Sequence, residues 1–347
     1  MIRALRDQLP LALVTGAYVG AVWGIDLATD LAPVSRLGWE SLLSGVGFAG
    51  GLTLLVTGCL LAVFGLTWIV GRASLASGRA RPFGSSWSVW RTHLSADRLL
   101  AAFVTLFLYA QLMNAFVGIK GQIPAIQPFV WDEAFMRLDR ALHFGSHPWV
   151  LLQPLVGTPG RTALLDRVYY VWFPVNLNFL IAFAWRPTDR LRNRFFLAFF
   201  GLWILLGTVM AVVFSSAGPC YYGRVVAGPD PFAPLMAYLH RVDAVHPLTA
   251  LDVQALLWEG YVGRGRLVEG IAAMPSLHVA VPVLFTIVAW GIDRRLGALF
   301  GVYTALILVG SVHLGWHYAV DGYVTLALVP AVWWLAGRLS RGPSPGE

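Results

Sequence analysis

Long runs of apolar residues, separated by polar connections, dominate the pattern of this chain. A helix needs about 18 or more such residues to cross the hydrocarbon core of a bilayer. By this criterion the pattern predicts eight spans, near residues 9–29, 43–70, 99–119, 168–185, 195–214, 271–290, 297–315 and 318–337. The sequence therefore predicts an all-α fold, a polytopic transmembrane helical bundle.

The composition agrees with a membrane protein. Of the 347 residues, 57% are hydrophobic and 12% are charged, whereas soluble domains average roughly 45–50% and about 25%. The net charge of +7 comes without a basic stripe interleaved with aromatic residues, so we expect membrane lipids and no nucleic acid as partners. Two cysteines, Cys59 and Cys220, are too few for a disulfide framework or a cysteine-rich zinc site.

Arginine is distributed unequally between the connections. The termini and the connections at 71–98, 186–194 and 291–296 are rich in arginine, and cytoplasmic segments prefer such residues. This predicts cytoplasmic N- and C-termini in a plasma or inner membrane.

The long connections 120–167 and 215–270 then lie on the extracytoplasmic side of the membrane. Connections of this length without structure of their own are usually functional. Apolar spacing in 131–144 and 234–257 predicts short helices on the outer membrane surface, with a plain ordered loop as an equally good alternative.

The strongest signal of chemistry lies in His313-Leu-Gly-Trp-His317-Tyr-Ala-Val-Asp321, where the seventh span ends and the eighth begins. An ionisable residue in an apolar span is costly unless it is paired, and it usually marks a function. His317 and Asp321 are four residues apart, so on a helix they share a face. A carboxylate on one imidazole nitrogen fixes the tautomer and leaves the other nitrogen as a nucleophile or base. A purely structural His-Asp pair is the alternative.

A second histidine follows in Met274-Pro275-Ser276-Leu277-His278, at the start of the sixth span. The predicted topology places it on the same membrane face as His317. The amides around Ser276, at the start of a helix, would offer hydrogen-bond donors to an anion. His278 is therefore a candidate acid or base, although a lone histidine at a helix start is more often structural.

Four basic residues of the outer connections are candidates for binding phosphate. Lys120, the single lysine of the chain, directly follows the third span, and lysine is a good point-charge partner for phosphate. The alternative interpretation of Lys120 is a structural one, in which its side chain only extends toward the lipid headgroups. Arg224, Arg264 and Arg266 could add bidentate contacts.

A metal site is a weaker interpretation. His313, His317 and Asp321 fall at i, i+4 and i+8, but the zinc-protease pattern needs a Glu beside the first His, where Leu314 stands. We therefore predict no metal ligands, and His313 either lines the pocket or hydrogen-bonds a neighbour.

These residues resemble the type 2 phosphatidic acid phosphatase superfamily, and more closely its branch that includes fungal inositol phosphorylceramide synthase. The second motif of that superfamily usually reads Pro-Ser-Gly-His, and here Leu277 gives the form typical of the inositolphosphotransferase-like branch. The third motif ends in His, three residues and Asp, which matches His317 and Asp321.

The first motif of the superfamily is matched only in part. It reads Lys, six residues, Arg-Pro, and the chain keeps Lys120 and Pro128 at that spacing. Gln127 replaces the Arg of this motif, and Ser311 stands where the third motif normally has Arg. We expect an outer arginine to substitute, or the substrate to differ.

The resemblance implies a six-helix phosphatase-type core at 99–337. A two-span extension with a cytoplasmic loop would precede it at 1–98, and a cytoplasmic tail would follow at 338–347.

The resemblance also implies a mechanism that requires no cofactor. His317, oriented by Asp321, would attack the phosphorus and form a phosphohistidine, while His278 protonates the leaving group. Lys120, the amides around Ser276 and the outer arginines would bind the phosphoryl oxygens. The donor would be a lipid phosphate or a lipid-linked phosphoryl group, and the acceptor water or an alcohol.

The expected function is therefore a lipid phosphotransferase or phosphatase at the outer membrane face, with a slight preference for phosphotransfer. The alternative is a non-enzymatic lipid or solute transporter in which His317 and Asp321 relay protons. It would predict ionisable residues deep in several spans, but the acidic residues in or at the edge of spans are Asp26 and Asp321 alone. A structural scaffold would not explain why a His-Asp pair and a second histidine share one face.

Overall fold

The computed structural model describes residues 2–29, 95–263 and 270–340, and the regular elements in these ranges are all helices. The expected second span, near residues 43–70, lies outside the described residues. So do the candidate phosphate ligands Arg264 and Arg266.

Within the described ranges, five helical stretches are long and apolar enough to cross a membrane. They belong to α1 (Ile2–Thr29), α5 (Ala96–Ile126), α10 (Arg190–Ile204) with its continuation through η2 (Leu205–Met210) and α11 (Ala211–Val213), α16 (Arg294–His313) and α17 (Ala319–Leu339). They correspond to the first, third, fifth, seventh and eighth predicted spans. The prediction of an all-α, polytopic membrane bundle is confirmed.

The fourth and sixth predicted spans are shorter helices than expected. The sixth is α15 (Leu277–Ile292), which begins directly after the motif that contains Ser276. The fourth is divided between α8 (Pro159–Tyr170) and α9 (Trp172–Ala184), which meet at Val171. Pro174 explains this break, because it has no N–H to donate to the carbonyl group four residues earlier.

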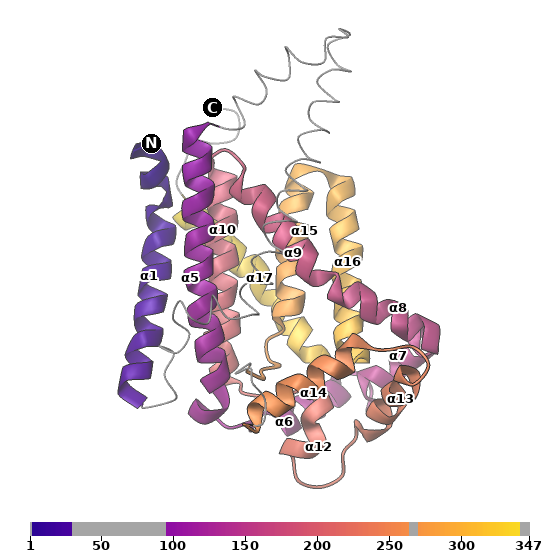
Figure 1. Ribbon diagram of the computed structural model, residues 1–347. Helices are drawn as coiled ribbons and strands as arrows, with labels where there is room; N and C mark the ends of the chain where they lie inside the picture. The colour runs from indigo at the N-terminus through magenta and orange to yellow at the C-terminus, as the bar shows by residue number, and fades with distance from the viewer. Residues whose placement is uncertain (1, 30–94, 264–269, 341–347) are drawn as a thin grey trace, which may run out of the picture.

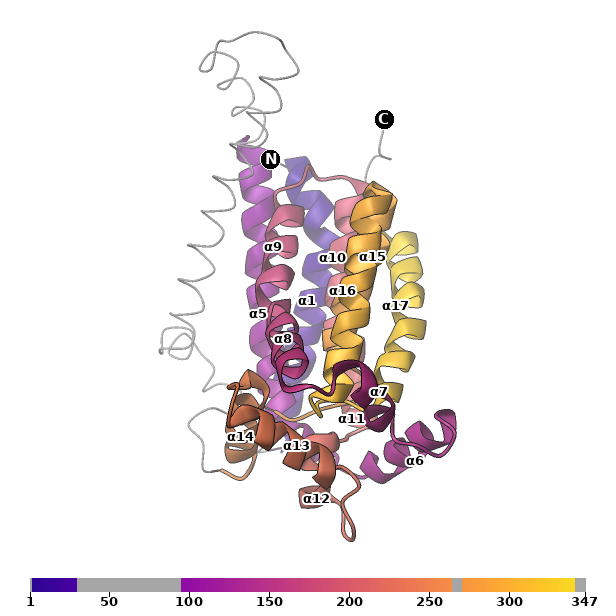
Figure 2. The same cartoon turned by 90° about the vertical axis from the view of Figure 1, so that its right-hand side faces the viewer.

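The long helices run roughly parallel to one another, and the short helices gather at one end of the bundle (Figure 1). Figure 2 shows α8 and α9 on the outside of the bundle, between α5 and α16. The start of α1 and the end of α17 lie at the end opposite the short helices. The two long connections predicted to share one membrane face therefore share one end of the bundle.

The short helices confirm the helical alternative for both long connections. The segment predicted at 131–144 is α6 (Asp132–Leu142), and the segment predicted at 234–257 is divided into two helices. The two helices of the second segment are α13 (Ala233–Asp243) and α14 (Thr249–Tyr261), and α7 (Pro148–Val156), η3 (Pro219–Tyr221) and α12 (Tyr222–Val225) lie at the same end.

Buried carboxylates join the short helices to their neighbours. Asp139 of α6 accepts hydrogen bonds from the Ala319 and Val320 amides at the start of α17, at 2.7 and 2.8 Å. Asp166 of α8 likewise accepts the two first amides of α14, each at 3.0 Å. These amides have no partner within their own helix, and the positive end of the helix dipole favours the negative charge.

Burial acts against the charge of these carboxyl groups. It raises the pKa of Asp139 to about 6, although the two backbone hydrogen bonds oppose the shift. The pKa of Asp166 is raised for the same reason, and the amides of α14 again oppose it. The contacts between helices are therefore made at the cost of removing a carboxylate from water.

Candidate active site

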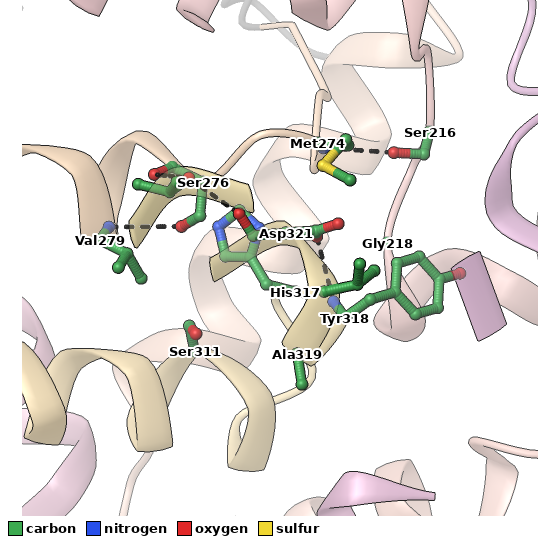
Figure 3. A network of polar contacts seen from close by, with 12 residues as sticks. Ser216, Gly218, Met274, Ser276, Val279, Ser311, His317, Tyr318, Ala319 and Asp321 are labelled. Atoms are coloured by element: carbon green, nitrogen blue, oxygen red, sulfur yellow. Dashed lines mark hydrogen bonds and ion pairs between the residues drawn. The ribbon is translucent and has the colours of Figure 1, made fainter. Parts of the chain in front are cut away.

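His317 and Asp321 form a buried pair at the start of α17 (Figure 3). Nδ1 of His317 lies 3.1 Å from Oδ2 of Asp321. Asp321 is fully buried, and only 6% of the His317 surface is exposed. Because an ionised carboxylate only accepts hydrogen bonds, the proton lies on Nδ1 and the lone pair of Nε2 is available for chemistry.

Local helix geometry explains why this pair forms. Tyr318 is the N-cap residue of α17, and Asp321 occupies the third helical position. Oδ2 of Asp321 accepts the Tyr318 N–H at 3.1 Å as well as the contact from His317. An acidic residue at this position commonly turns back to the N-cap amide. The same hydrogen bond that begins the helix thus holds the carboxylate against the imidazole.

Ser311 occupies the place where the third motif normally has arginine. Its carbonyl oxygen accepts the N–H groups of Trp316 and His317, at 2.9 and 3.0 Å. Its hydroxyl donates to the carbonyl of Leu308 within α16. In this chain the position therefore fixes the backbone of the turn that carries His317.

His278 faces His317 from the first turn of α15, with 6.2 Å between the ring centroids. Three aromatic side chains also lie against its ring. Tyr169 stacks at 5.1 Å, Trp172 lies at 4.7 Å, and Phe173 meets it edge-on at 6.2 Å. The structure brings together the two histidines that the sequence placed on one face.

Ser276 is fully buried and acts as the N-cap of α15. Its hydroxyl oxygen accepts the Val279 N–H at 3.3 Å, and its own N–H donates to the carbonyl of Asp321 at 3.4 Å. Thr325 donates to the carbonyl oxygens of both residues. The start of α15 is therefore bonded directly to the first turn of α17, which fixes His278 relative to His317.

Lys120 lies on α5, which continues beyond the predicted end of the third span to Ile126. Gly270 packs against α5 at this point, so closely that a Cβ added to it would collide with the Lys120 carbonyl. The Lys120 ammonium lies 5.9 Å from the centre of the Phe116 ring. The lysine and the segment that leads to His278 are thus side by side.

Residues 215–220, here named the bridging segment, hold both motifs in place. The carbonyl and hydroxyl of Ser216 accept the amides of Ala273 and Met274, at 2.9 and 3.2 Å. Cys220 donates its N–H to the carbonyl of Gly315 at 2.9 Å. Gly218 has φ of 99°, and an added Cβ would come within 2.6 Å of the Trp316 carbonyl oxygen. Only glycine meets both demands.

Asp132 connects the bridging segment to the turn before α17. It accepts hydrogen bonds from the amides of Ala217 and Gly218 and from the Tyr318 hydroxyl, at 2.8–3.1 Å. Burial raises the pKa of its carboxyl group, and these hydrogen bonds oppose the shift. The sequence reasoning missed Asp132 and Asp139, whose only local signal is two acidic residues on one face of a short helix.

His313 and Arg224 were also considered from the sequence, and the structure places each beside side chains other than those of the two histidine motifs. Nε2 of His313 is 2.9 Å from the Thr162 hydroxyl, which also contacts the hydroxyl of Tyr238 at 2.7 Å. This agrees with the expectation that His313 hydrogen-bonds a neighbour. Arg224 is exposed, with its guanidinium 4.7 Å from the centre of the Trp258 ring.

Comparison with known proteins gives one match. A family model described as the PAP2 superfamily covers residues 133–335, which is more than half of the chain. The matched region begins in α6 and includes both histidine motifs, whereas Lys120 precedes it. No curated protein and no solved structure matches the chain.

Proposed function

The chain belongs to the PAP2 superfamily, and we propose that it is a membrane-embedded lipid phosphotransferase or phosphatase that works through a phosphohistidine. Membership supports phosphatase-type chemistry in general. The observation that carries the finer proposal is the His317–Asp321 pair facing His278 across 6.2 Å. Proton-relay transport, the alternative left open by the sequence, gains no support from this family.

In the proposed first step, Nε2 of His317 attacks the phosphorus and forms an N–P bond. The bond between phosphorus and the leaving oxygen breaks, its electron pair goes to that oxygen, and His278 donates a proton there. Asp321 holds the proton on Nδ1 and stabilises the positive charge that develops on the ring. The N–H groups of Ser276 and Val279 are used within the protein. Lys120 and the amides of Leu277 and His278 in the first turn of α15 therefore face the charge on the phosphoryl oxygens.

In the second step, an acceptor oxygen takes the phosphoryl group from His317. Water gives phosphatase activity, and an alcohol gives phosphotransfer. We keep the slight preference for phosphotransfer, because Leu277 in the second motif follows the inositolphosphotransferase-like form. We place the reaction at the extracytoplasmic face, since the arginine-rich connections 186–194 and 291–296 lie at one end of the bundle, whereas α15 and α17, which carry the histidines at their starts, begin toward the other end.

The test is release of the leaving alcohol by purified protein in detergent, with chelator present. The substrates are phosphatidic acid, an isoprenyl diphosphate and a sphingolipid phosphate; for the diphosphate, the release of phosphate is measured. We expect His317→Ala to abolish release. The matched control is His313→Gln, which changes a buried histidine that hydrogen-bonds Thr162 instead. Equal release by His317→Ala and the unchanged protein would exclude the proposed nucleophile.

A further inference from the structure

The aromatic side chains beside His278 connect it to the outer surface of the bundle. Trp172, which contacts the imidazole, is buried, but its neighbour Phe173 is 54% exposed. The rings of Trp172 and Phe173 are 5.1 Å apart, and Phe173 also meets His278 directly. The proposed proton donor is therefore one side chain away from the surface of the bundle.

The exposed surface at this point is apolar. Val171, at the junction of α8 and α9, is 45% exposed, and Tyr170 stacks on Phe173 with 6.1 Å between ring centroids. Figure 2 shows this junction on the outside of the bundle, beside the membrane-length helix α5. A surface of this kind at the level of the spans is in contact with hydrocarbon chains in a membrane.

The in-line geometry of phosphoryl transfer relates this apolar surface to the leaving group of the reaction. The attacking and leaving atoms lie roughly in line on opposite sides of the phosphorus. With His317 as the attacking group, the leaving oxygen points toward His278, which must reach it to donate a proton. Whatever is attached to the leaving oxygen therefore extends toward Trp172 and Phe173, away from His317.

We propose that the hydrocarbon chain attached to the leaving oxygen passes over Trp172 and Phe173 at the α8–α9 junction into the membrane. This inference rests on the proposed function. It assigns a specificity role to Phe173, which contacts the chain and takes no part in proton transfer.

The experiment compares octyl phosphate with hexadecyl phosphate, both presented in detergent micelles with enzyme in excess. Release of the alcohol reports the first step, whatever the acceptor is. We expect Phe173→Ala to lower the ratio of the hexadecyl to the octyl rate roughly tenfold relative to the unchanged protein. Loss of contact with a buried methylene changes a rate by about fourfold, and a phenyl ring covers more than one.

Two control variants separate this role from a general effect. Phe107→Ala removes a phenylalanine of similar exposure, 48%, from α5 and should leave the ratio unchanged. Phe173→Leu keeps an apolar side chain and should retain most of the preference. A ratio that Phe173→Ala leaves unchanged, or lowers no more than Phe107→Ala, overturns the inference.

The failure of the proposed function gives a different result. Alcohol release that persists in His317→Ala, or no release by the unchanged protein, refutes the phosphohistidine step, and the inference falls with it. Release that requires His317 but whose chain-length ratio does not depend on Phe173 refutes the inference alone.

Discussion

Replacement of Asp321 by asparagine separates two contributions of this residue to the proposed reaction. Both hydrogen bonds of the carboxylate end on Oδ2, and Oδ1 has no hydrogen-bond partner among the residues that the structure describes. The amide oxygen of asparagine can occupy the Oδ2 position and accept the same two hydrogen bonds, with its NH2 group in the place of Oδ1. Asp321→Asn should therefore keep the imidazole oriented and remove only the negative charge.

The expected loss follows from the geometry of the pair. During attack the imidazole becomes positively charged, with its charge centre about 4 Å from that of the carboxylate. At an effective dielectric constant of about 20, two unit charges at this distance attract each other by about 4 kcal/mol. Loss of this attraction from the transition state slows the first step by about 1,000-fold.

The assay is alcohol release with enzyme in excess, together with thermal unfolding to show that the variant is folded. Asp321→Ala is the comparison, because it also leaves the Tyr318 N–H without its acceptor and should be both slower and less stable. A rate for folded Asp321→Asn within tenfold of the unchanged protein would refute the reasoning, since the carboxylate would then not act on the charged imidazole.

Three further predictions concern the short helices and the topology. The raised pKa of Asp139, about 6 against about 3.9 for an ordinary aspartate, means that the folded protein keeps a proton that the unfolded chain loses between pH 4 and 6. Stability should fall as the pH rises through this window, and Asp139→Asn should flatten that slope in thermal unfolding; an unchanged slope contradicts the assignment. Asp166→Ala should lower the free energy of unfolding by about 1–3 kcal/mol, since two amides of α14 lose their acceptor, and a denaturant titration that finds no change would show that water replaces it. In a background without native cysteines, a membrane-impermeant maleimide added outside should label Phe144→Cys, before α7, and spare Pro187→Cys, before α10; the reverse pattern would invert the proposed orientation.

The sequence predicted the contacts that depend on spacing along one helix. His317 and Asp321 meet because four residues make about one turn, and the apolar runs are long enough to identify most of the spans. The break in the fourth span was missed, although Pro174 carries the signal for it. The end of α5 was placed too early, because Lys120 and Gly121 interrupt the apolar run while the backbone remains helical.

Contacts between distant segments could not be predicted from a single sequence. Asp132 and Tyr318 are 186 residues apart, and nothing in the pattern around either residue indicates the other. The role of Ser216 in holding Met274 is hidden for the same reason. The identity of the reacting side chains was thus accessible from short motifs, while the parts that hold them in position depend on how the whole chain folds.

The two acidic side chains of α6 have a consequence for recombination between related proteins. Asp132 and Asp139 are seven residues apart, two turns on one helix face. Asp132 accepts the Tyr318 hydroxyl directly before α17, and Asp139 accepts the first two amides of α17. An exchange that takes α6 from one parent and α17 from another keeps the histidine motif intact. The Tyr318 hydroxyl and the first amides of α17 keep their acceptors only if the incoming α6 carries the same two carboxylates. A crossover between residues 142 and 313 therefore tests a compatibility that motif alignment alone would overlook.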